Sequence, residues 1–151
     1  MASKVRTTAG STLGISTTAP ATYNDTGFGG LTFDLIADIT EFGEFGRVYN
    51  LVTHNPIADR RTVKRKGSFN DGAITLQLGR DGTDLGQIAV DTASDSDDSA
   101  YFELTLQDGT ILYFSAQVMG FTYNLGNVDS ITAGAVTLEI DNDILNVPVT
   151  P

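Results

Sequence analysis

The chain has 151 residues and contains no cysteine, no tryptophan and a single histidine, His54. Without cysteine there is neither a disulfide framework nor a thiolate metal site, which favours a reducing compartment. One histidine leaves no His-rich zinc site and no distinct Ser-His-Asp set, so we interpret His54 as a loop or interface residue. No stretch approaches the roughly 20 apolar residues that span a bilayer, and no apolar leader is visible. We therefore expect a protein that is neither secreted nor membrane-bound.

Positive charge is also scarce, and it is unevenly distributed. The formal net charge is −10, from nine Lys and Arg against nineteen Asp and Glu. Five of the nine cations lie within residues 60–66, which leaves four cations against nineteen acids elsewhere, a net charge of −15. Such a surface repels nucleic acid over most of its area, but its two parts attract each other between copies. These five residues are Arg60, Arg61, Lys64, Arg65 and Lys66.

The length suits one domain, and the hydrophobic pattern is mostly that of strands. ITLQL at 74–78 alternates cleanly, which indicates one buried face. Phe102, Leu104 and Leu106 alternate up to Asp108-Gly109, a dipeptide typical of type I′ hairpin turns, and a second β-rich run follows. ITAGAVTLEI at 131–140 predicts a last strand.

One short helix is expected at about residues 83–94. Leu85, Ile88, Ala89 and Thr92 have helical spacing, while Asp81, Thr83 and Asp84 are cap candidates and Gly86 weakens the helix. The fold class is therefore mainly β, an antiparallel β-sandwich or barrel with this flanking helix and extended terminal arms.

No cofactor, metal or catalytic site is expected. Asp95, Asp97 and Asp98 have the spacing of calcium ligands, but Ala100 and Leu106 stand where an EF-hand needs glycine and glutamate, so a solvated acidic loop is the better interpretation. GFGG at 27–30 lacks the context of a dinucleotide loop and is interpreted as a flexible hinge.

The basic segment cannot be buried in the core of its own chain. As a strand it would direct Arg60, Lys64 and Lys66 to one side and Arg61 and Arg65 to the other, so neither side avoids unpaired charge. We expect residues 55–67 to project, with the NDG turn at 70–72 returning the chain to the sheet. A solvated loop without function remains open, whereas an inter-subunit contact explains both the clustering and the acidic remainder.

Four stretches of the chain carry a resemblance to a known family: TTAGSTLGIS near the start, EFGEFGRVYNLVTHNPIADRRTVKRKGSFNDGAITLQLGRDGTDLGQ in the middle, and then LTLQDGTILYFSAQVMGF and DSITAGAVTLEID. Together they resemble the tail tube (major tail) protein of long, flexible-tailed bacteriophages. The resemblance implies a structural virion protein that is not an enzyme, with a single domain over residues 1–151. It also implies hexameric rings that stack into a hollow tube around a tape-measure protein.

In that family the genome leaves through the bore, and a long loop and the terminal arms reach the next ring. The matching segments here are a projecting basic loop at 50–68, an N-terminal arm at 1–25 and a C-terminal arm at 141–151. We therefore expect the protein to be located in the virion tail and to assemble in the host cytoplasm. We expect other tail proteins as its partners, viral DNA that passes through without specific binding, and no contact with a membrane. The inter-ring contact would be made by Arg60, Arg61, Lys64, Arg65 and Lys66.

The charge distribution agrees with such a stack, because a head-to-tail repeat needs two different complementary faces on each copy. A negative bore also suits DNA transit, since a cationic lining would hold phosphates. Candidate acids for that lining are Glu41, Glu44, Glu103 and Asp108.

Two other classes of protein remain open. A monomeric β-sandwich binding or decoration module would need an exposed aromatic platform, and here most Phe and Tyr fall within strand patterns. A nucleic-acid-binding protein could use the basic segment, but no aromatic residue is interleaved in it to stack bases.

Overall fold

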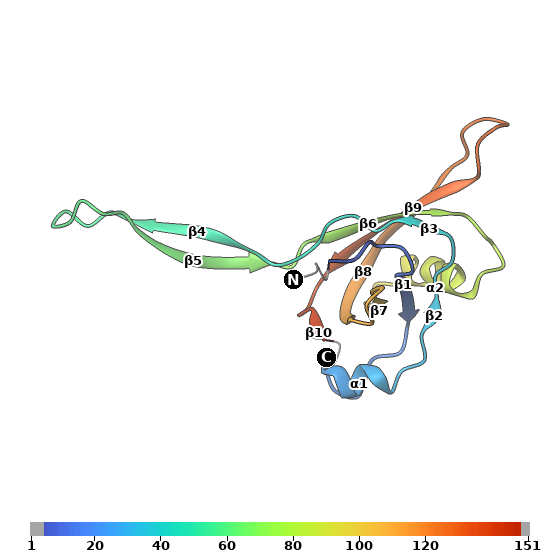
Figure 1. Ribbon diagram of the computed structural model, residues 1–151, viewed down its shortest axis with the longest axis horizontal. Coiled ribbons are helices and arrows are strands. Elements are labelled where there is room, and N and C mark those ends of the chain that lie inside the picture. Colours follow the sequence, from blue (N-terminus) through green and yellow to red (C-terminus); the bar gives the residue numbers. More distant parts are fainter. Residues whose placement is uncertain (1–4, 149–151) are drawn as a thin grey trace.

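The computed structural model describes residues 5–148 as an antiparallel sheet that curls into a half-barrel, from which one long hairpin projects (Figure 1). The large sheet has the strand order β2-β1-β7-β8-β9-β6-β3, with β10 paired to β8, while β4 and β5 form a separate two-stranded sheet. The predicted mainly β antiparallel fold is confirmed. The elements in chain order are β1 Thr12–Ser16, α1 Asp25–Gly29, β2 Asp34–Leu35, β3 Ile39–Glu41, β4 Val48–His54, β5 Val63–Asn70, β6 Ala73–Gly79, α2 Leu85–Ser94, β7 Ala100–Thr105, β8 Ile111–Asn124, β9 Ala133–Ile140 and β10 Leu145–Val147.

The core fills the inside of the curl. Alternation in β6 buries Ile74, Leu76 and Leu78, as the sequence predicts, and the facing residues of the other strands and of α2 complete one cluster. The large side chains at its centre are fully buried: Leu13, Ile15, Phe102, Phe114, Leu138, Val136 and Val90.

Helix α2 confirms the helix expected at about 83–94, but it buries a different face. Leu85 and Ile88 are exposed, and Gly86, Gln87, Val90 and Ala93 are buried instead. The Gln87 amide is fully paired: its Nε2 donates to the carbonyls of Ala37 and Gly79, and its Oε1 accepts from the Asp81 amide at 2.9 Å. A polar side chain that makes these three bonds can be buried at low cost, which hydrophobic spacing alone does not reveal.

Asp84 and Gly86 fix α2 against the sheet. Asp84 is the N-cap, and its carboxylate accepts from the amides of Gln87 and Ala37, both at 3.0 Å. A Cβ on Gly86 would lie 2.2 Å from the Leu35 carbonyl oxygen. Glycine therefore costs helix propensity here but permits the close contact with β2.

The β7–β8 hairpin is confirmed, although its turn is not type I′. A type I′ turn needs positive φ at both central residues, whereas only Gly109 has it here, at 95°. The connection is longer: the Leu106 amide donates to the Thr110 carbonyl at 2.8 Å. The Asp108 carboxylate accepts from the Thr110 amide at 2.9 Å, and this bond lowers the pKa of Asp108.

The range expected as an N-terminal arm, 1–25, contains part of the folded body. Residues 12–16 form β1, which pairs with β7 along its whole length, and residues 1–4 lie outside the described part of the chain. GFGG is not a hinge, because residues 27–29 belong to α1 and Phe28 is fully buried. Residues 1–30 have low hydrophobicity and no apolar periodicity, so the sequence pattern did not predict β1 or α1.

Phe28 begins a second, aromatic layer on the outer face of the sheet. Its ring stacks on Tyr113 at 5.0 Å and meets the edge of Tyr23 at 5.1 Å. The Tyr23 hydroxyl accepts from the Ser115 amide and donates to the Asp143 carbonyl, and burial raises its pKa. Within the range expected as a C-terminal arm, 141–151, residues 145–147 pair with β8 as β10, and residues 149–151 lie outside the described part.

Replacing Gly86 by alanine tests the close contact of α2 with β2. In an exposed helix the change would stabilise by about 0.5–1 kcal/mol. Here we expect destabilisation by about 1–3 kcal/mol in urea unfolding, because the added methyl group overlaps backbone atoms. Gly82→Ala is the control, since a Cβ there has open space around it. A stabilised Gly86→Ala variant would contradict the contact.

Candidate assembly interface

The projecting hairpin is made of β4 and β5, which pair with each other and leave the body as a long ribbon (Figure 1). Residues 50–68, expected as a projecting loop, form most of this ribbon. The register of the strand pairing shifts between the pairs Tyr49–Phe69 and Leu51–Lys66. At this irregularity the side-chain amide of Asn50 donates to the Ser68 hydroxyl at 2.8 Å. At the base, Gly72 with φ of 90° ends the hairpin before β6 begins, as the NDG turn predicts.

The five clustered cations all lie on this hairpin and are all exposed. Arg60 and Arg61 are in the connection between the strands, and Lys64, Arg65 and Lys66 are in β5. Lys66 is opposite Leu51 and Arg65 is opposite Val52. Because successive residues of a strand point to opposite faces, both faces of the ribbon carry positive charge.

Cations and aromatic rings alternate along one face of the hairpin. The Arg47 guanidinium lies 4.0 Å from the centre of the Phe69 ring, Phe69 lies 5.3 Å from Tyr49, and the Lys66 ammonium lies 4.7 Å from the Tyr49 ring. The body has a similar contact, in which Arg80 covers Tyr123 at 3.7 Å. These half-exposed or exposed rings therefore have cations over them and do not form a bare aromatic platform.

Arg47 also fixes the base of the hairpin to the body. Its Nε donates to Asp71 at 3.0 Å and its Nη2 to Asp143 at 2.5 Å. Arg47 directly precedes β4 and Asp71 directly follows β5, so these bonds join the two ends of the hairpin to the segment that precedes β10. The bond to Asp71 is the main reason why the pKa of Arg47 is raised. Asp71 is buried, and the pair with Arg47 compensates its charge.

Apolar side chains of the hairpin are exposed, and the sequence-based interpretation missed them. Val48, Leu51, Val52 and Ile57 all present large apolar surfaces to solvent. A signal was available, because apolar residues in RVYNLVTH occupy positions of both parities and so cannot share one buried face.

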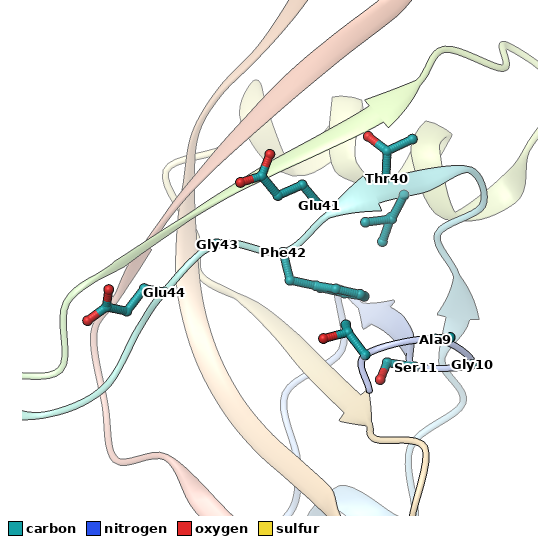
Figure 2. A pocket seen from close by; sticks show the side chains of 10 residues that line it. Ala9, Gly10, Ser11, Thr40, Glu41, Phe42, Gly43 and Glu44 are labelled. Carbon is teal, nitrogen blue, oxygen red and sulfur yellow. The ribbon is translucent and has the colours of Figure 1, made fainter. Parts of the chain in front are cut away.

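Two of the acidic candidates, Glu41 and Glu44, lie in or beside β3 and are exposed. They belong to the rim of a groove of about 660 Å³ between residues 8–11 and 39–44. Figure 2 shows both carboxylates pointing away from Ser11, while Phe42 points toward it. Glu41 pairs with Gln77 of β6, which places it on the outer face of the sheet.

The other two acidic candidates lie elsewhere. Glu103 is half-buried in β7 opposite Tyr113, under the aromatic layer, and Asp108 is exposed in the β7–β8 turn close to Arg6. The structure therefore does not bring the four acids together on one surface.

The outer face of β6, β9 and the second half of β8 is uncovered and polar. Register places four cross-strand rows on it, from Ala73–Glu139–Gln117 to Gly79–Ala133–Asn124, and Glu41 and Glu139 are its acids. The other residues of these rows are uncharged and mostly small: Ala73, Thr75, Gln77, Gly79, Gln117, Gly120, Thr122, Asn124, Ala133, Ala135 and Thr137.

His54 ends β4 opposite Val63 and is exposed on the hairpin. Asp95, Asp97 and Asp98 are exposed after α2. Over residues 5–148, no three His, Asp or Glu side chains are placed to hold a metal ion together. No helix in this part of the chain has the length and apolar character needed to cross a membrane.

Solved structures share this fold at low sequence identity. A chain of the six-fold symmetrised anti-feeding prophage baseplate matches with a TM-score of 0.72 and 11% identity, over 97% of this chain and 97% of that one. The sheath/tube terminator structure of an extracellular contractile injection system gives 0.64 and 12%, over 90% and 93%. The tail of an empty gene transfer agent particle, with C6 symmetry, gives 0.60 and 14%, over 78% and 87%.

By sequence, no protein-family model and no curated protein matches the chain. At 11–14% identity the structural matches show a shared fold and do not by themselves assign a function.

The role of Arg47 is tested by Arg47→Met, which keeps an apolar stem beside Phe69 and removes both ion pairs. We expect the β4–β5 amides to exchange hydrogen about tenfold faster, because Asp71 loses its partner, while β6 and β9 amides are unchanged. Arg61→Met, at the far end of the hairpin, is the charge-matched control. Equal exchange in both variants would show that Arg47 does not hold the hairpin.

Proposed function

We propose that this chain is the tail tube subunit of a long, flexible-tailed phage-type particle. Copies assemble into hexameric rings, and the rings stack into a hollow tube through which the genome passes. The observation that carries this proposal is the β4–β5 hairpin, a basic and apolar ribbon on an acidic body that covers neither of its faces. The shared fold with chains of symmetric tail and baseplate assemblies supports it.

The shape of the subunit supports a head-to-tail stack. The hairpin and the loop between β8 and β9 project toward opposite ends of the molecule (Figure 1). That loop also exposes apolar side chains, Leu125, Val128 and Ile131. Two different surfaces at opposite ends form a contact that repeats without closing, as a tube of variable length requires. Arg60, Arg61, Lys64, Arg65 and Lys66 supply the charge for this contact.

The bore is formed by the open polar face of β6, β8 and β9. A polymer of phosphates passes most easily along a wall of small polar side chains with a few acids and no cation. Glu41 and Glu139 are on this face, and Glu44 is exposed three residues after Glu41. Glu103, beneath the aromatic layer, and Asp108, beside Arg6, lie outside the lining in this arrangement.

The remaining partners follow from this role. A tape-measure protein occupies the bore before the DNA, other tail proteins bind the ends of the tube, and the subunit has no catalytic activity. The protein is then a component of the virion tail that assembles in the host cytoplasm.

The source of two of the similar structures favours a second role, at the end of a tube. One is part of a baseplate and another a sheath/tube terminator structure, so a subunit of this fold can belong to an end of a tube. In that role the copies form a single ring, and no further ring of this chain is added to it. The monomeric binding module has less support, because the exposed rings Phe69, Tyr49 and Tyr123 are covered by cations.

Electron microscopy of the purified protein at high concentration tests the proposal, with light scattering after size exclusion to follow association. We expect hollow tubes of uniform diameter and many stacked rings. Single rings that never lengthen would favour the terminator role. Persistent monomers would contradict both roles, and binding of duplex DNA at near-physiological salt, lost when the five cations become Ser, would indicate a nucleic-acid-binding protein.

Reversing charge on β5 tests the electrostatic part of the contact. We expect Lys64→Glu, Arg65→Glu and Lys66→Glu together to leave circular dichroism native, because all three residues are exposed, and to prevent stacking. The control exchanges the same residues without changing charge: Lys64→Arg, Arg65→Lys and Lys66→Arg. Tubes of normal length from the reversed variant would show that these cations do not make the contact.

A further inference from the structure

The projection formed by the ends of β8 and β9 has less support than the rest of the large sheet. β7 pairs with β8 only as far as Ala116, so the second half of β8 pairs with β9 on one side and with no strand of residues 5–148 on the other. The register also shifts between Val118 and Gly120, and such an irregularity bends a strand. Strand pairing alone therefore does not set the direction in which the loop at 125–132 leaves the body (Figure 1).

Arg80, the residue that follows β6, holds both strands of this projection. Its backbone amide donates to the Thr132 carbonyl at 2.9 Å, directly before β9 begins. Its Nη2 donates to the carbonyls of Phe121 and Thr122 in β8, at 3.1 and 3.3 Å. These two carbonyls come directly after the register shift. Arg80 thus fixes the far side of the bend to the body.

The Arg80 guanidinium also covers two rings of the projection. Its central carbon lies 3.4 Å from the centre of the Phe121 ring and 3.7 Å from the centre of the Tyr123 ring. Gly134 is opposite Tyr123 in β9 and leaves space for this contact. A Cβ at Gly134 would lie only 3.0 Å from the Arg80 Nε, so a larger residue there would displace the guanidinium.

Burial of Arg80 is costly for a residue that only covers the core. Its side chain is 8% exposed, and its Nε is buried without a hydrogen-bond partner among residues 5–148. The carboxylate of Asp91 in α2 lies 3.5 Å from Nη1 and is 55% exposed, so water screens this ion pair. An apolar side chain would cover Phe121 without the cost of desolvating a charge. Arginine adds the directional bonds to β8 at this position.

The loop that Arg80 holds at its root is closed by its own bonds. The Asn127 side chain accepts from the Asp129 amide at 3.0 Å, and the Asn127 carbonyl accepts from the Ser130 amide at 3.0 Å. Because the turn is closed within the loop, the direction of the whole loop depends on how its root is held. Its large apolar side chains are all exposed: Leu125, Val128 and Ile131.

We propose that Arg80 is a positioning residue that sets the direction of the β8–β9 loop and thereby prepares the loop for contact with another copy of the chain. This inference rests on the proposed stacking of subunits, in which the loop lies at one end of the molecule, and it names the residue that orients that end. A fixed root presents the apolar side chains of the loop in one orientation, so less conformational entropy is lost when the contact forms.

The direction of the loop can be measured in the free subunit, because the cysteine-free chain accepts two spin labels at chosen positions. Val128→Cys labels the loop and Leu85→Cys labels α2, and both side chains are exposed. Pulsed electron spin resonance at low concentration should give a narrow distribution of distances between the labels. We expect the distribution to be at least about twofold broader in Arg80→Met, which keeps an apolar stem over the rings and loses the bonds to β8. An unchanged distribution would overturn the proposal.

Two controls separate positioning from other roles of Arg80. Asp91→Asn removes the exposed ion pair and leaves the bonds to β8 in place, so its distribution should stay narrow. Ile15→Val removes a methyl group from the core in β1, which lowers the urea midpoint without contact with Arg80. Its distribution should also stay narrow. Broadening in either control equal to that in Arg80→Met would overturn the proposal, because the ion pair or the lower stability would then account for the effect.

The consequence for assembly is measured with the same variants without labels. We expect the concentration of Arg80→Met needed to form tubes to rise at least about tenfold, a loss of about 1.4 kcal/mol, while both controls assemble like the unchanged chain. Normal tube formation by Arg80→Met would show that the direction of the loop does not serve the contact and would overturn that part of the inference. If the unchanged chain forms no tubes or rings, the proposed function itself fails, whereas the distance measurement in free subunits still tests Arg80. The two failures are therefore distinguishable.

Discussion

The β4–β5 hairpin carries apolar side chains on both faces, and within residues 5–148 no element covers either of them. This constraint determines how the rest of the structure is used. The body closes one core with the curled sheet and α2, and a second aromatic layer with α1, and no residue of the hairpin belongs to either. The chain therefore has a body whose apolar side chains it buries itself and a hairpin whose apolar side chains it leaves exposed.

Such a division is useful only if the hairpin keeps a fixed direction. Arg47 supplies this by joining Asp71 and Asp143 while its guanidinium covers Phe69. The pair with Asp71 has low exposure on the acidic side, where water screens it less than a surface ion pair. A cation and a ring at its base thus fix the direction of the ribbon relative to the body. In the proposed assembly, a fixed direction reduces the entropy lost on binding.

Local patterns predicted the elements that bury one regular face. Ile74, Leu76 and Leu78, the β7–β8 hairpin and the existence of α2 could all be recognised in this way. The prediction was wrong where a polar or glycine residue makes the contact: Gln87 and Gly86 define the buried side of α2, and residues 12–16 form a strand within a polar segment. Clustering identified the cations of the candidate interface, but not Leu51 and Val52. Apolar residues on both faces of a strand do not match burial of one face against the core of a single chain, so the pattern predicted no structure.

The edges of the body disfavour association of one sheet with another. The outer strands of the large sheet are short, two residues in β2 and three in β3, and β3 carries a register shift, so neither offers a long row of free backbone groups. Beyond β3 the chain follows β6 through Gly43, where a Cβ would lie only 3.0 Å from the Thr75 carbonyl oxygen. Bodies with a large excess of acids also repel one another. Unspecific pairing of sheet edges is thereby disfavoured, and in the proposed assembly the basic ribbon supplies the positive charge that attracts an acidic body.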